Sequence, residues 1–135
     1  SIEYLGPQYG TDLLACYAAS DCFVFPSYRE GFPNTVLEAG AMGLPSIVTD
    51  INGSREIVVC KNEENVTPVK DMKVCDNGII IPSKNEKVLY QAMEAVVKNE
   101  KMRVSMSLQA RKMIASRFEQ SFVQQCLIDF YKEIM

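Results

Sequence analysis

The chain has 135 residues, 47% of them hydrophobic and 23% charged, with a formal net charge of −3. These values fit one soluble globular domain and exclude bulk disorder, a membrane-spanning segment and a basic surface for duplex nucleic acid. Histidine is absent, which excludes Ser-His-Asp and Cys-His catalysis and imidazole-metal sites within the chain. The five cysteines form no CxxC, and their odd number without a secretory signal predicts reduced, cytosolic thiols. A disulfide between Cys60 and Cys75, which flank a polar insert, stays open as the alternative.

Short apolar runs that end at glycine or proline alternate with stretches of helical periodicity in the first two thirds of the chain. They predict a strand at 2–5, a helix at 11–20, a strand at 22–25, a helix at 34–42, a strand at 46–49, a short helix at 54–59 and a strand at 79–82. The run at 22–25 is continuously apolar, which is typical of a strand buried on both faces. We expect Thr11 or Asp12 to cap the first helix, Asn34 to cap the second, and Gly43 to end the second.

The last third of the chain is predicted to be helical, with apolar residues at helical spacing in 84–99, 102–114 and 119–135. The polar segment 61–76 is expected to form an exposed loop or hairpin. Alternating strands and helices predict an α/β fold, and right-handed crossovers place helices on both faces of a parallel sheet. Only about four strands can be counted, fewer than a complete doubly wound domain has. We therefore expect 1–135 to be a single partial domain with a truncated Rossmann-like sheet and a helical C-terminus.

One segment combines the features of a ligand site. Residues 25–38 run from the carboxyl end of a predicted strand, through a loop, to a helix N-terminus, where open α/β sheets bind ligands. Unpaired amides and the helix dipole there favour a phosphate. Glu30 and Glu38 are eight residues apart, and a carboxylate can accept two hydrogen bonds from a vicinal diol such as ribose. The structural alternatives are a helix-dipole role for Glu38 and an ion pair of Glu30 with Arg29; a hydrolase carboxylate pair fits this placement poorly.

The sequence at 26–45 resembles the signature of retaining GT-B glycosyltransferases of group 1 (family 4), in which Glu-x7-Glu is followed by small residues, glycine and proline. Three further segments are similar to family motifs. They are Tyr17-Ala18-Ala19-Ser20-Asp21, the Gly-x-x-Glu-Ile pattern within 50–58, and Asn77-Gly78 before an apolar strand. The resemblance runs nearly the whole length of the chain and implies the C-terminal part of a GT-B donor domain.

The resemblance also implies roles for individual residues. Glu30 would be the catalytic residue, in contact with the transferred sugar near the reacting centre, and Glu38 would bind the ribose hydroxyls. Pro7 and Gln8 match the loop that holds the base. The resemblance implies no metal and no cofactor, with a nucleotide-diphospho sugar, UDP preferred, as the substrate. The donor diphosphate would be held by the residues of the loop and helix start, Gly31, Phe32, Pro33, Asn34 and Thr35.

Two parts of the family pattern have no counterpart in this chain: the upstream basic pair that neutralises the diphosphate, and the N-terminal acceptor domain. We therefore expect the chain to supply part of a donor site, to need the missing half as its partner, and to be inactive in isolation. An apolar stripe at 119–135 also predicts self-association.

The implied function of the parent enzyme is retaining transfer of a hexosyl unit to a lipid-linked saccharide in bacterial capsule or other polysaccharide biosynthesis. Its expected location is the cytoplasm, peripheral to the inner membrane face. Two alternatives remain: a GT-B-fold nucleotide-sugar epimerase, and a non-catalytic nucleotide-binding or assembly module. The absence of histidine disfavours the first, and the presence of both Glu30 and Glu38 disfavours the second.

Overall fold

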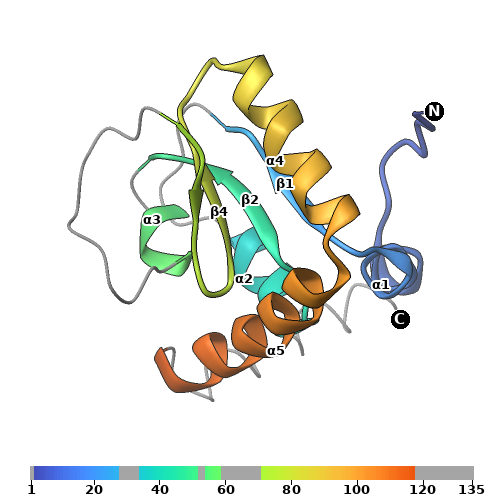
Figure 1. The fold of residues 1–135 in the computed structure, drawn as a ribbon. Helices are drawn as coiled ribbons and strands as arrows, with labels where there is room; N and C mark the ends of the chain where they lie inside the picture. Colours follow the sequence, from blue (N-terminus) through green and yellow to red (C-terminus); the bar gives the residue numbers. More distant parts are fainter. Residues whose placement is uncertain (1, 28–33, 52–53, 59–70, 118–135) are drawn as a thin grey trace.

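The computed structural model describes residues 2–27, 34–51, 54–58 and 71–117 (Figure 1). Its elements are α1 (Gly10–Ala19), β1 (Phe23–Phe25), α2 (Asn34–Ala41), β2 (Ser46–Thr49), α3 (Ser54–Ile57), β3 (Lys73–Val74), β4 (Gly78–Ile81), α4 (Glu86–Lys98) and α5 (Glu100–Arg117). The predicted alternation of strands and helices is thereby confirmed from α1 to α5. The helix predicted at 119–135 lies outside the described residues.

The strands form one sheet in the order β1-β2-β4-β3. β1 pairs with β2 and β2 with β4 in parallel, whereas β3 pairs with β4 antiparallel. Every residue of β2 and β4 is buried, as expected for the central strands of a parallel sheet. Of the segment predicted as a loop or hairpin at 61–76, the last part forms the β3–β4 hairpin, and 61–70 lie outside the described residues.

Helices cover both faces of the sheet, as predicted. α4 lies along one face, and α2 and α3 lie on the other (Figure 1). Alternate strand residues supply the two cores, because successive side chains of a strand point to opposite faces. One core contains Val48 and Ile80 with Val36, Leu37, Ile57, Val58, Cys75 and Ile114. The other contains Ile47, Ile79 and Ile81 with Val88, Ala92, Val96 and Met106.

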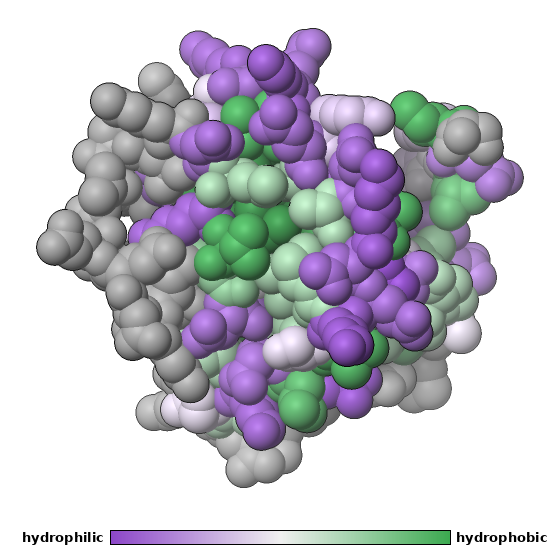
Figure 2. Space-filling model, viewed as in Figure 1, coloured by the Kyte–Doolittle hydropathy of each residue, from purple (hydrophilic) through white to green (hydrophobic). Residues whose placement is uncertain are grey.

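α5 joins the two layers, since it contributes Ile114 to one core and Met106 to the other. Figure 2 shows the α4 side of the molecule, where hydrophilic residues predominate along α4 and hydrophobic side chains gather beside it over the sheet. Among the helices of the described part of the chain, none combines the length and apolar character that crossing a bilayer requires.

Glycine ends α2, as predicted. Gly43 has φ +79°. Its amide donates to the Gly40 carbonyl at 2.9 Å, and the Leu44 amide donates to the Ala39 carbonyl at 2.9 Å. These two bonds form a Schellman motif, which satisfies carbonyls that the helix end would otherwise leave without partners.

The N-terminal region differs from the prediction in three respects. Residues 2–5 are exposed and form no strand, because no strand edge pairs with them in the described part of the chain. β1 is half-buried rather than buried on both faces, since it lies at the edge of the described sheet. Tyr9 is the N-cap residue of α1 and makes no side-chain capping bond, so Thr11 and Asp12 lie inside the first turn.

α4 buries a narrow stripe of apolar residues. Only Val88, Ala92 and Val96 are buried, whereas the side chains of Met93 and Val97 are 44% and 73% exposed. The buried residues are four apart and therefore lie on one line of the helix.

The cysteines differ in state. Cys75 is disulfide-bonded, which corrects the expectation of reduced thiols for this residue; its partner lies outside the described part of the chain. Cys16 and Cys22 are free thiols and half-buried.

Candidate functional site

The predicted site lies at the carboxyl edge of the parallel sheet. β1 ends at Phe25 and α2 begins at Asn34, so the segment between them connects a strand end to a helix start. The carboxyl ends of β1, β2 and β4 share this edge because the three strands are parallel. In open α/β sheets, ligands bind at such an edge.

A cavity of about 410 Å³ opens at the same edge. Residues at or just beyond the ends of three strands line it, together with the start of α4. They are Pro26, Thr49, Ile81, Pro82, Lys84, Asn85, Glu86 and Leu89. The cavity places space for a ligand beside the strand ends, and its described lining does not include Pro7, Gln8, Thr35 or Glu38.

The residues predicted to hold the sugar and the diphosphate divide into two groups. Glu30, Gly31, Phe32 and Pro33 lie outside the described residues. Asn34 is the first residue of α2, and Thr35 follows it with an exposed side chain in the first turn. The described part of the site is therefore the helix start, whose first-turn backbone amides have no partner within the helix and suit an anion.

The loop predicted to hold the base lies before α1. Pro7 is exposed. The Gln8 side chain is half-buried, and its Nε2 donates to the Leu5 carbonyl at 2.8 Å. This bond folds the loop back on itself and directs the Gln8 amide to the local backbone.

One side-chain bond ties the loop after β1 to the neighbouring strand. The Thr49 hydroxyl, at the end of β2, donates a hydrogen bond to the Ser27 carbonyl. Thr49 is itself buried. The bond fixes the point where the chain leaves β1 and enters the segment that carries Glu30.

Glu38 is the predicted site residue that the structure defines best. It lies about one turn inside α2 and is half-buried. The Tyr17 hydroxyl donates to Glu38 Oε2 at 3.3 Å, across 21 residues of sequence. A carboxylate has about four acceptor positions, enough for the Tyr17 hydroxyl and a vicinal diol together.

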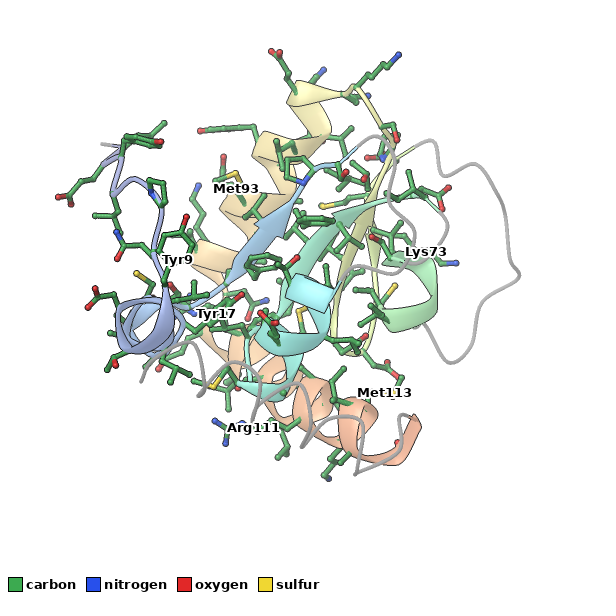
Figure 3. The ribbon with its side chains drawn as sticks, turned by 180° about the vertical axis from the view of Figure 1, so that it is seen from behind. Tyr9, Tyr17, Lys73, Met93, Arg111 and Met113 are labelled. Carbon is green, nitrogen blue, oxygen red and sulfur yellow. The ribbon has the colours of Figure 1, made fainter. Side chains whose placement is uncertain are left out.

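Tyr17 comes from α1, and Figure 3 shows it on the side of the helix that faces α2. Its side chain is 7% exposed and packs with Ala39 and Leu44. The Tyr17 and Phe23 rings have centroids 6.2 Å apart at an interplanar angle of 60°. Burial, followed by the charge of Glu38 and the hydrogen bond to it, raises the pKa of Tyr17 well above its usual value. The phenol therefore stays neutral and remains a hydrogen-bond donor.

Tyr17 is not among the site residues predicted from the sequence. The signal was present, since Tyr17 is the polar member of an otherwise apolar stripe of α1 with Leu13 and Leu14. A buried tyrosine hydroxyl usually has a hydrogen-bond partner. Which residue that partner is depends on how α1 packs on α2.

The chain matches the sequence model of "Glycosyl transferases group 1" over residues 1–113. It is 27% identical, over all of its own length, to N,N'-diacetylbacillosaminyl-diphospho-undecaprenol alpha-1,3-N-acetylgalactosaminyltransferase of Campylobacter jejuni. It covers 31% of that protein. Over 45 residues, 33% of this chain and 11% of the relative, it is 56% identical to UDP-Gal:alpha-D-GlcNAc-diphosphoundecaprenol alpha-1,3-galactosyltransferase of Escherichia coli.

Among solved structures, the C-terminal domain of the group 1 glycosyl transferase LpcC from Francisella tularensis matches with a TM-score of 0.65 at 19% identity. The match covers 88% of this chain and 53% of that one. The resemblance in fold stated from the motifs is thus confirmed by the whole architecture. The chain spans less than a third of the C. jejuni relative's length. It belongs to the group 1 glycosyltransferase family, and its fold is that of the GT-B enzymes.

Proposed function

We propose that the protein containing this chain transfers a glycosyl unit from a nucleotide-diphospho sugar to a lipid-linked saccharide, with retention of configuration. The chain supplies part of the donor site. Glu38 binds the ribose hydroxyls, the start of α2 holds the diphosphate, and Glu30 contacts the transferred sugar near the reacting carbon. Pro7 and Gln8 lie in the loop that holds the base.

The observation that carries the proposal is the placement of Glu38. Its half-buried carboxylate lies one turn into a helix that starts at the carboxyl edge of a parallel sheet, and a buried tyrosine holds it. A helix start attracts phosphate, and a carboxylate one turn further along the helix can accept the adjacent diol of a nucleotide. The helix start and Glu38 thus follow each other along α2 in the same order as the diphosphate and the ribose in a nucleotide.

The names of two relatives support one substrate class. The E. coli relative is named for UDP-Gal as the donor, and both relatives are named for acceptors linked to diphospho-undecaprenol. Both names also specify α-linked products, and an α-linked product from an α-linked donor is retention. We therefore propose a UDP-hexose as donor and a polyprenyl-linked sugar at the cytoplasmic face of the membrane as acceptor.

The chain alone is proposed to be inactive. The developing charge on the leaving diphosphate needs stabilisation that preorganised donors or cations provide. The family's basic pair and acceptor domain have no counterpart in these 135 residues. The acceptor half of the enzyme is therefore the proposed partner of this domain.

The test uses the full-length gene product with UDP-galactose, UDP-N-acetylgalactosamine and GDP-mannose as donors. N-acetylglucosaminyl-diphospho-undecaprenol serves as acceptor. We expect transfer from one of the UDP sugars and an α-anomeric product by proton NMR. A β-anomeric product would contradict retention. If none of the three donors is either transferred or hydrolysed, the proposed reaction is wrong.

A further inference from the structure

We propose that Tyr17 is a positioning residue of the donor site: its hydroxyl holds the Glu38 carboxylate in the orientation that receives the ribose hydroxyls of the nucleotide. The inference rests on the proposed function, since ribose binding by Glu38 is part of it. The contact joins two helices that are separate in sequence, α1 and α2.

The donor side of this contact is rigid. The Tyr17 ring is buried against Ala39 and Leu44, and the Phe23 ring lies beside it. A tyrosine has only two side-chain torsions, and this packing restricts both. Its hydroxyl is therefore a fixed point near the first turns of α2.

The acceptor side needs such a fixed point. A glutamate side chain has three rotatable bonds and loses much rotamer freedom when it is ordered. Without the Tyr17 hydroxyl, the carboxylate would lose more of that freedom when the nucleotide binds, which would weaken binding. The bond from Tyr17 orders the carboxylate beforehand, so that less freedom is lost on binding.

The charge state of the contact is also suited to this role. Burial and the nearby Glu38 carboxylate raise the pKa of the phenol, so that it stays protonated throughout the physiological range. A neutral phenol donates one hydrogen bond and adds no charge that would compete with the ribose. The contact is therefore constant while nucleotide binds and leaves.

A purely structural role makes a different prediction. If the hydroxyl only satisfies a buried polar group, Tyr17→Phe changes thermal stability and leaves nucleotide recognition unchanged. If the hydroxyl positions Glu38, the substitution weakens binding through the ribose. The two roles separate when a ribonucleotide is compared with its 2′-deoxy form.

The experiment uses the full-length gene product and isothermal titration calorimetry. UDP, GDP and ADP are titrated first, and the nucleotide that binds tightest is then compared with its 2′-deoxy form. We expect Tyr17→Phe to raise the dissociation constant of the ribonucleotide about tenfold, as for loss of a charge-assisted hydrogen bond. The preference over the 2′-deoxy form should shrink. In turnover, KM should rise while kcat stays near the wild-type value.

A double-mutant cycle links the effect to Glu38. In the Glu38→Gln background, Tyr17→Phe should change the dissociation constant by less than about twofold, because the partner it positions has already lost its charge. Tyr90→Phe is the matched control, since Tyr90 is a 67% exposed tyrosine on α4. It should leave binding and melting temperature unchanged.

The outcomes separate this inference from the function on which it rests. Normal nucleotide binding by Tyr17→Phe, with weakened binding by Glu38→Gln, would overturn the inference and leave the proposed function intact. An equal effect of Tyr17→Phe with and without Glu38 would also overturn the inference, since it would indicate packing. Unchanged binding by Glu38→Gln, or no binding of any of the three nucleotides to the wild type, would overturn the proposed function and this inference together.

Discussion

The two ends of α2 differ in how their polar groups are satisfied. At the C-terminal end, the Gly43 and Leu44 amides bond to carbonyls of the last turn. Arg111 Nη2 of α5 donates to the Met42 carbonyl at 3.4 Å. At the N-terminal end, the first-turn amides have no partner within the helix. Four residues further along, the half-buried Glu38 carboxylate accepts a hydrogen bond from Tyr17 of α1.

A second cavity, of about 300 Å³, lies next to the C-terminal end of α2, and the cation in its lining also serves the fold. Its lining includes Arg103, whose Nη1 donates to the Val96 and Val97 carbonyls at 2.9 and 2.6 Å. That cation therefore serves to cap the end of α4. The C-terminal end of α2 therefore serves the fold, whereas the N-terminal end is the part proposed to hold the nucleotide.

The largest expected effect concerns Glu30, just before α2. Glu30→Gln should lower kcat by about 2–4 kcal/mol of transition-state stabilisation, on the scale of a lost preorganised polar contact. The reason is that the transferred sugar changes charge and geometry during reaction. Single-turnover kinetics of the full-length gene product measure the effect. A kcat close to wild type in a folded variant would remove Glu30 from the site.

Glu38→Gln should act differently. Ribose is remote from the reacting bond and is bound alike in ground and transition states, so KM should rise while kcat changes little. A lost hydrogen bond to a charged group is worth about 1.5–3 kcal/mol. Steady-state kinetics with varied donor measure the effect, and circular dichroism with thermal melting checks the fold. Equal losses of kcat and kcat/KM would assign Glu38 to the transition state instead.

At the other end of α2, Gly43→Ala should reduce stability and leave donor binding unchanged. The left-handed conformation costs a non-glycine residue about 1–2 kcal/mol, and a Cβ there would lie 2.5 Å from Arg111 Nε. Urea unfolding monitored by circular dichroism measures the loss.

Gly43→Asn is the matched control, because it adds the same Cβ but tolerates a positive φ better. It should lose less stability than Gly43→Ala. Weakened nucleotide binding by either variant, with the fold intact, would mean that the two ends of α2 are not separate in function.

The smallest effect concerns Cys22, which precedes β1 at the amino edge of the sheet. Burial, and secondly the negative charge of Asp21, raises the pKa of the Cys22 thiol to about 11 from an ordinary value of 9.0. The reactive thiolate should therefore be scarce at pH 8 and increase as the pH rises towards 11.

Iodoacetamide labelling followed by peptide mass spectrometry measures this pH dependence. Saturating nucleotide should not alter the rate at Cys22, because the proposed ligand site lies at the opposite edge of the sheet. Protection of Cys22 by nucleotide would contradict that placement, and fast labelling at pH 8 would contradict the burial of the thiol.

The two ends of α2 also differ in how well the sequence predicts them. Gly43 followed by Leu44 and Pro45 is a local signal, and the end of the helix follows from it. The Tyr17–Glu38 contact spans 21 residues and depends on helix packing, so no local pattern predicts it. The motif still identifies Glu38 as a candidate, because the order of strand, loop and helix can be read from the chain.

The incorrect predictions for 2–5 and 22–25 have a related cause, because both depend on tertiary packing. The apolar run at 22–25 and the alternating residues at 2–5 both have the composition of strands. Whether such a run is central, at an edge or unpaired depends on which other strands lie beside it. β1 lies at the edge of the described sheet and 2–5 pair with no strand there, a result that residue type alone does not determine.

The most direct test of the central claim is hydrogen–deuterium exchange across α2 in the full-length gene product, with and without saturating UDP. We expect slower exchange in the peptide that spans residues 31–38, because its amides and Glu38 are proposed to hold the nucleotide. The amides of Gly43 and Leu44 are already bonded and should exchange at the same rate in both conditions. Binding of UDP with no protection at 31–38, or with protection confined to the C-terminal end of α2, would contradict the account.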